Sequence, residues 1–135
     1  MRNKPFCVIT FLLFAYLNSF AQKSKLSHCD SSVRAKAFEI YQGLIKNTAD
    51  TSKFASIAIL YSNDTATAAS GGRAERFKLN DCDETIAKTI KKMKPGDISK
   101  PIENSQGFYL IRLNNKNGKW YEMQDILLRF CPNSN

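Results

Sequence analysis

The sequence predicts a single domain of the α+β class, in which a small antiparallel sheet is covered by about three helices. Apolar residues recur at helical spacing in residues 33–45, 52–61 and 86–93, and they alternate between two faces along Phe108–Leu113. The dipeptide Pro95-Gly96 is a turn signal between the last helix and the strands. A length of 135 residues with 43% hydrophobic residues suits one globular domain.

The formal charge of +8 is explained most simply by a lysine-rich surface. No glycine-rich phosphate loop and no basic patch interleaved with aromatic residues is found, so a nucleic-acid partner is not expected. The only histidine, His28, has no ligand set near it in the sequence, and no Cys-x-x-Cys spacing exists. We therefore expect neither a metal site nor a cofactor.

Residues 1–21 are expected to be a signal peptide. The basic residues Arg2 and Lys4 precede an apolar run that ends in Ser19-Phe20-Ala21, which suits cleavage before Gln22. The run is short for a membrane span, although an uncleaved membrane anchor stays an alternative. Export predicts a periplasmic or secreted location in which disulfides form.

Three helices are expected after a loose segment at residues 22–32. The first begins near Val33 and the second covers Ser52–Tyr61, because both carry apolar residues on one helical face. The third is expected to begin with Asp81 as its cap and to end at Pro95, since Glu84 follows Asp81 at the spacing of a capping box.

Four short segments read as strands. Arg73–Leu79 has a charged side, and Ile98–Ile102 is placed at a sheet edge because Pro101 has no backbone N–H. Phe108–Leu113 is largely apolar on both faces, which is typical of a central strand that is covered on both sides. Trp120–Phe130 reads as one more strand.

Two stretches of the chain resemble the parvulin-type peptidyl-prolyl isomerase family, also named PpiC or rotamase. Residues 94–101 and 107–112, KPGDISKP and GFYLIR, match the family segments Lys-Pro-Gly-Glu-Ile-Ser-x-Pro and Gly-Tyr-His-Ile-Ile-Lys. Residues 54–64 and the later Gly71-Gly72 match Phe-x-x-Leu-Ala-x-x-Tyr-Ser-x-Asp and a Gly-Gly pair. The resemblance implies a parvulin-like four-stranded antiparallel sheet wrapped by about three helices.

The first strand of the family, of the type Ala-Arg-His-Ile-Leu-Leu-Lys, has no counterpart before Val33. Residues 123–129, MQDILLR, match it instead near the C-terminus. Either the domain, at residues 33–131 with a tail at 132–135, is circularly permuted, or this strand pairs with another chain. We favour the permuted interpretation, because a missing central strand would leave open sheet edges.

The resemblance implies an isomerase that acts on X–Pro bonds without a nucleophile, by binding the twisted amide more tightly than the planar one. Its polar floor, built in the family from two histidines and a Cys or Asp, falls on Tyr109, Asp125 and Arg73 in this chain. A tyrosine hydroxyl can donate to a carboxylate across two strands, so Tyr109 and Asp125 are interpreted as a replacement pair. Alternatively, Tyr109 belongs to the core, Asp125 to the surface and Arg73 to a solvated loop.

The proline-binding pocket of the family falls on residues that remain apolar here: Phe77, Cys82, Ile86 and Met93. We therefore expect binding of unfolded or proline-containing polypeptide segments. Three functions stay open, namely a weak exported isomerase for extracytoplasmic proteins, a binding module without isomerase activity, and an accessory chain of an envelope complex.

The cysteines outside the signal segment are Cys29, Cys82 and Cys131. If the last strand takes the place of the family's first strand, Cys131 lies near Cys29, where the family has a peptide link. The resemblance therefore implies a Cys29–Cys131 disulfide and leaves Cys82 as a small buried thiol. Two unpaired cysteines near the termini are the alternative.

Overall fold

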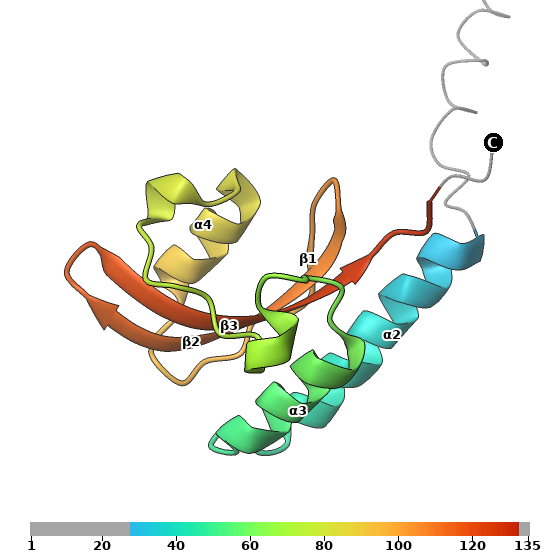
Figure 1. Cartoon of the computed structure of the whole chain (residues 1–135), viewed down its shortest axis with the longest axis horizontal. Helices are drawn as coiled ribbons and strands as arrows, with labels where there is room; N and C mark the ends of the chain where they lie inside the picture. The colour runs from blue at the N-terminus through green and yellow to red at the C-terminus, as the bar shows by residue number, and fades with distance from the viewer. Residues whose placement is uncertain (1–27, 133–135) are drawn as a thin grey trace, which may run out of the picture.

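The structure, a computed structural model, describes residues 28–132, so the predicted signal peptide at residues 1–21 lies outside it. The fold is α+β, with two 3₁₀ turns besides its main elements (Figure 1). These main elements are α2 (His28–Ile45), α3 (Thr51–Tyr61), α4 (Glu84–Lys92), β1 (Ile102–Glu103), β2 (Gly107–Asn117) and β3 (Trp120–Arg129). The three strands form one antiparallel sheet in the order β1-β2-β3. In the described part of the chain, no helix is both long and apolar enough to cross a membrane.

The central strand is β2, and helices cover the sheet on both sides, as Figure 1 shows. Phe108 and Leu110 pack on one face in a cluster with residues of α2 and α3. Ile111 and Leu113 pack on the other face in a cluster with residues of α4. The prediction of a central strand that is buried on both faces is therefore confirmed.

The strand β3 pairs with β2 of the same chain, with a continuous register from Gly107 opposite Arg129 to Leu113 opposite Met123. The alternative in which this strand pairs with another chain is therefore not needed. The turn into β3 uses Gly118 at a left-handed φ of 58°.

The outer edge of β3 is covered by residues 62–77, which run beside it without forming a regular strand. Backbone bonds join Asn63 N to Leu127 O at 2.7 Å and Asp125 N to the carbonyl oxygen of Gly72 at 2.8 Å. Further along, single bridges pair Arg73 with Gln124 and Phe77 with Tyr121. The sheet thus has three strands instead of the expected four, because the segment meets β3 only at separated points.

The first helix begins earlier than predicted. The helix α2 starts at His28, so residues 28–32 are helical and not part of a loose segment. A disulfide joins Cys29 in its first turn to Cys131 after β3, with the two Cα atoms 6.1 Å apart. This is the pairing expected from the sequence, and Cys82 is a free thiol. Asp30 adds a hydrogen bond, because its Oδ1 accepts from Cys131 N at 3.3 Å. The disulfide and this hydrogen bond tie residues 28–32 to Cys131, just after β3. Such long-range links explain why the helix starts earlier than the local sequence pattern predicts.

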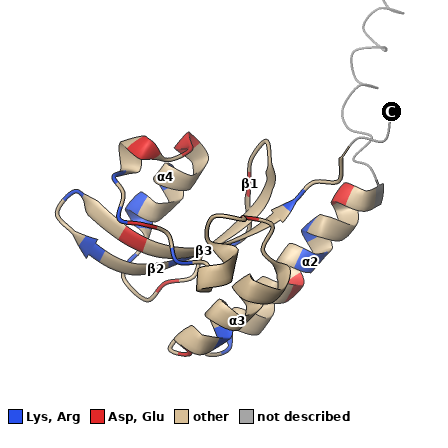
Figure 2. Cartoon of the chain, viewed as in Figure 1, with Lys and Arg blue, Asp and Glu red and all other residues tan. Residues whose placement is uncertain are grey.

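The third helix, α4, has a different cap from the predicted one. Asp83 is the N-cap, and its Oδ1 accepts from Thr85 N and Ile86 N. Asp81 belongs to the preceding 3₁₀ turn, where it accepts from Lys78 N at 3.1 Å. The helix ends at Lys92 rather than at Pro95. Acidic residues lie at its start and lysines at its end, as Figure 2 shows, which suits the helix dipole.

Candidate functional site

The two candidate floor residues lie on the same face of the sheet. Tyr109 is directly opposite Leu127, and Asp125 is directly opposite Ile111. Residues that face one another in an antiparallel pair point to the same side, and so do residues two apart on one strand. Tyr109 and Asp125 are therefore diagonal neighbours on the face that α4 covers, as the parvulin resemblance requires.

Asp125 is buried, with 2% of its surface exposed. Neither carboxylate oxygen has a hydrogen-bond partner among the described residues. Burial raises the pKa of this carboxyl to about 6, the Thr67 hydroxyl opposes the rise, and the nearby Asp64 carboxylate adds to it. A carboxyl with a pKa of about 6 is mostly neutral below that pH and mostly charged above it.

Tyr109 does not form the predicted hydrogen bond with Asp125. It is half-buried, and its hydroxyl donates to Gln106 Oε1 at 3.0 Å. The phenol thus reaches back to the hairpin loop before β2 instead of across to β3. Burial raises the pKa of the Tyr109 hydroxyl, and the charges of Asp64 and Asp125 raise it further. Asp125 therefore affects Tyr109 through its charge and not through a direct hydrogen bond.

The four predicted pocket residues come together with Tyr109 in one apolar cluster under and beside α4. Ile86 and Met93 form its buried base, whereas Phe77 and Cys82 are partly exposed at its surface. Burial raises the pKa of the Cys82 thiol, and Asp81 and Asp83 raise it further, so Cys82 stays a neutral apolar side chain near pH 7. The cluster offers apolar and aromatic surface to a ligand.

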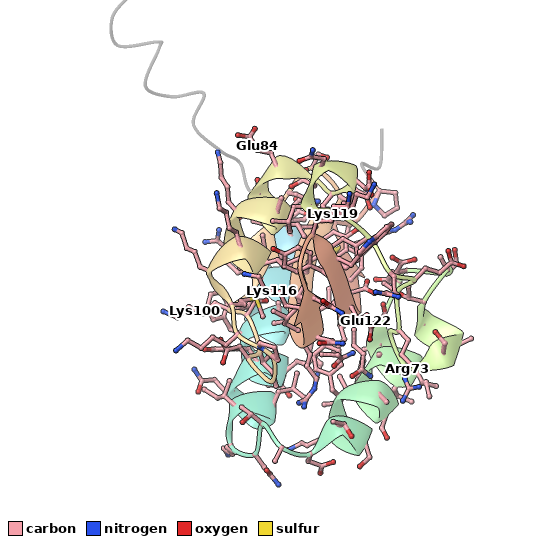
Figure 3. The ribbon with its side chains drawn as sticks, turned by 90° about the vertical axis from the view of Figure 1, so that its left-hand side faces the viewer. Arg73, Glu84, Lys100, Lys116, Lys119 and Glu122 are labelled. Atoms are coloured by element: carbon pink, nitrogen blue, oxygen red, sulfur yellow. A yellow bond between two sulfur atoms is a disulfide. The ribbon has the colours of Figure 1, made fainter. Side chains whose placement is uncertain are left out.

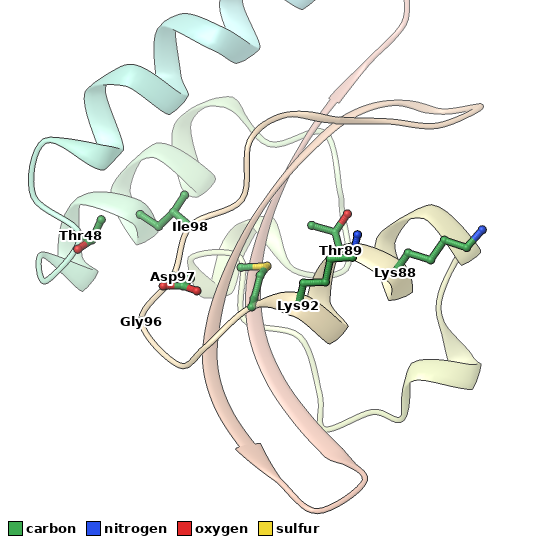
Figure 4. A pocket seen from close by; sticks show the side chains of 8 residues that line it. Thr48, Lys88, Thr89, Lys92, Gly96, Asp97 and Ile98 are labelled. Atoms are coloured by element: carbon green, nitrogen blue, oxygen red, sulfur yellow. The ribbon is translucent and has the colours of Figure 1, made fainter.

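Met93 also lines a hollow of about 420 Å³ between α4 and the segment around Asp97 (Figure 4). Thr48, Lys88, Lys92 and Ile98 are among its other walls. Its lining is mixed, with lysines at the rim, so it differs from the apolar surface that Phe77 and Cys82 present.

Arg73 is not brought to Tyr109 and Asp125. It is exposed, and its backbone forms an isolated β-bridge with Gln124, the residue before Asp125 on β3. Because consecutive strand residues point to opposite faces, Arg73 and Gln124 lie on the face away from Asp125. Thr67 and Asp64, which do surround Asp125, were missed in the sequence because they lie in a loop without periodic signal. The Gly71-Gly72 pair, which brings this loop against β3, was the one feature of the sequence that indicated a close approach to the sheet.

The α+β fold agrees with a comparison of sequences. The rotamase family, described as the PPIC-type PPIASE domain, matches residues 16–115. The chain belongs to this family of peptidyl-prolyl isomerase domains. The matched region ends before β3 begins at Trp120.

Foldases are among its relatives. The chain is 28% identical over 112 residues to the foldase protein PrsA of Bacillus subtilis. The aligned region covers 83% of this chain and 37% of that protein. It is 32% identical over 100 residues to the foldase protein PrsA 2 of Listeria innocua, covering 73% of this chain and 33% of that protein. The chain thus spans about a third of the length of these curated relatives.

Proposed function

We propose that this chain is exported and binds proline-containing, unfolded segments of extracytoplasmic proteins on the α4 face of its sheet. The apolar cluster of Phe77, Cys82 and Tyr109 supports this proposal, because a proline ring needs an apolar surface beside the peptide bond that rotates. The foldase relatives support the choice of unfolded polypeptide as the ligand. Membrane contact is proposed only through an uncleaved signal segment.

The isomerase activity that we propose is weak at neutral pH, and the environment of Asp125 carries this conclusion. Its carboxyl is buried without a hydrogen-bond partner on the face that holds the apolar cluster. Rotation about an X–Pro bond has a barrier of about 20 kcal/mol, which an enzyme lowers by favouring the twisted amide. An ionised carboxylate at the floor repels the carbonyl oxygen of that amide. Since the pKa of Asp125 is about 6, this repulsion is present at pH 7.5 and reduced at pH 5.

The isomerase proposal includes a rearranged connection, in which β3 fills the place of the first strand of the family. Residues 123–129 match that strand in sequence, and β3 follows the region that matches the family. In this arrangement Asp125 and Tyr109 occupy the two histidine positions of the floor.

The test is an exchange measurement by NMR on an X–Pro peptide, with wild type, Tyr109→His and Tyr109→His/Asp125→His. We expect weak exchange in wild type that increases from pH 7.5 to pH 5, and a gain of at least about tenfold in the double variant at pH 7.5. Wild-type activity equal to that of a competent parvulin would reject the proposal that the substituted floor makes the isomerase activity weak. A folded double variant without any gain would reject the assignment of these two positions.

The second candidate function is a binding module without isomerase activity. It is favoured by the same combination of a retained apolar cluster and a floor without histidine at its assigned positions. Suppression of aggregation of a proline-containing unfolded protein, together with no exchange at either pH, would select it over the isomerase.

A further inference from the structure

A second hollow, of about 660 Å³, lies where β2 and β3 meet residues 73–76. Its walls include Thr51, Arg73, Arg112, Asn114, Glu122 and Gln124. Arg112 and Gln124 face one another across the strands, on the side of the sheet away from Asp125. This hollow is therefore distinct from the proline-binding face.

The base of the hollow holds a buried guanidinium without an acidic partner. Arg112 is 7% exposed, and its Nη1 donates to the Thr48 carbonyl oxygen at the connection between α2 and α3. Its Nε makes no hydrogen bond, and none of the ion pairs among residues 28–132 includes Arg112. A buried charge without a counter-charge is costly. The Thr48 carbonyl oxygen accepts from only one of the guanidinium nitrogens, so most of the donor capacity of Arg112 is unused.

The lining of the hollow as a whole carries three arginines and two glutamates, so it keeps one excess positive charge. Glu122 pairs with Arg76 at 3.3 Å, and the Arg76 guanidinium also lies over the Trp120 ring at 5.8 Å. This pairing leaves Arg73 on the rim and Arg112 at the base, with Glu75 as the remaining acid of the lining. The hollow is thus suited to an anion that meets Arg112.

We propose that this hollow binds a carboxylate of the client polypeptide, an Asp or Glu side chain or a C-terminal carboxylate, with Arg112 as the residue that recognises it. Arg112 lines the hollow, and a guanidinium carries its N–H donors in one plane, which suits the two oxygens of a carboxylate. Met123 connects the two sites, because it lines the hollow and packs against the apolar cluster of Tyr109 and Cys82. The identity of the client as a polypeptide rests on the proposed function.

The experiment compares two labelled peptides without proline, one with a single Glu and an amidated C-terminus, and the same peptide with Gln in its place. Fluorescence anisotropy at low salt measures their affinities for wild type, Arg112→Met, Arg73→Met and Lys100→Met. Lys100 is an exposed control on the opposite side of the molecule from Arg73 (Figure 3). We expect wild type to prefer the Glu peptide by about tenfold, Arg112→Met to lose this preference and Lys100→Met to keep it. Because the peptides contain no proline, the result does not depend on isomerase activity.

Equal affinities for the two peptides in wild type, or an unchanged preference in folded Arg112→Met, would overturn the proposal. An equal loss in Lys100→Met would also overturn it, by showing that net charge alone attracts the peptide. Arg73 is exposed, so its variant tests the rim even if Arg112→Met fails to fold, and a reduced preference is expected. Inorganic phosphate is added as a competitor. If phosphate displaces the Glu peptide no more than its ionic strength alone explains, the result supports a carboxylate site. Tight phosphate binding without a preference for Glu would reject the polypeptide ligand.

Discussion

At the scale of single residues, Asp125 has the largest effect on the chemistry of the molecule. It is buried in the sheet, with the Thr67 hydroxyl and the Asp64 carboxylate beside it. The carboxyl therefore keeps its proton to a higher pH in the folded chain than in the unfolded chain, where the pKa is near 3.8. At neutral pH, the ionised Asp125 carboxylate therefore lowers the free energy of unfolding.

The change Asp125→Asn is expected to stabilise the protein at neutral pH. As pH rises from about 4 to about 6, the unfolded chain gives up the Asp125 proton first, so the free energy of unfolding falls. The loss is complete above the folded pKa of about 6 and amounts to about 3 kcal/mol, since one pKa unit is about 1.4 kcal/mol. Asparagine does not ionise, so the variant should match wild type near pH 3.5 and exceed it at pH 7.5.

Urea unfolding at the two pH values measures this difference. Subtracting wild type from variant at each pH cancels the contributions of all other acids. A difference that does not change with pH would mean that Asp125 titrates normally in the folded chain.

The resemblance to the family was sufficient to assign Tyr109 and Asp125 to one floor, and the register of β2 and β3 places both residues on the same face. It was not sufficient to predict their partners. Tyr109 donates to Gln106, and Asp125 meets Thr67 and Asp64, through contacts that depend on how two loops lie on the sheet. Such contacts leave no periodic pattern in a single sequence.

At the scale of elements, the approach of residues 62–77 to β3 depends on Gly72. Its φ is 79°, and a Cβ atom at this position would lie 2.3 Å from the Asp125 carbonyl oxygen. The Asp125 oxygen is a backbone atom, and backbone hydrogen bonds hold Gly72 to Thr67 and to Asp125, so neither segment moves apart without breaking these bonds.

The change Gly72→Ala is expected to destabilise the protein by more than about 3 kcal/mol, because strain and a backbone clash add together. Gly118→Ala is the matched control. Its φ of 58° is also left-handed, but nothing lies within 4 Å of a Cβ there, so only about 1 kcal/mol should be lost. Thermal unfolding of both variants gives the comparison, and similar losses at the two glycines would show that the contact with Asp125 is loose.

Element types were easier to predict than element ends. The apolar patterns of residues 52–61 and 108–113 indicated α3 and β2 correctly. The start of α2 at His28 was missed because its first turn is held by the disulfide and by Asp30, which are long-range contacts. Asp81 and Asp83 both precede α4 at plausible capping distances, and only the 3₁₀ turn of the folded chain decides that Asp83 is the cap.

At the scale of the whole molecule, the Cys29–Cys131 disulfide joins α2 to the end of β3 across 102 residues. Closing a loop of this size removes conformational freedom from the unfolded chain, worth up to about 4.7 kcal/mol in the chain-entropy treatment. Cys29→Ser/Cys131→Ser should therefore lose between about 2 and 5 kcal/mol in urea unfolding.

Cys82→Ser provides the control, since the Cys82 thiol is free. Adding a reductant should lower the free energy of unfolding of wild type and of Cys82→Ser, and it should leave the double serine variant unchanged. Insensitivity of wild type to the reductant would contradict a disulfide in the folded protein.

The position of β3 in the chain has a consequence for biosynthesis. A ribosome makes α2, α3 and β2 before β3, yet Ile126 and Leu128 of β3 belong to the same buried cluster as Leu44 and Phe54. Until β3 emerges, β2 has an unpaired edge and residues 62–77 have nothing to bind. The buried core that β3 shares with α2 and α3 therefore forms only after β3 has been made.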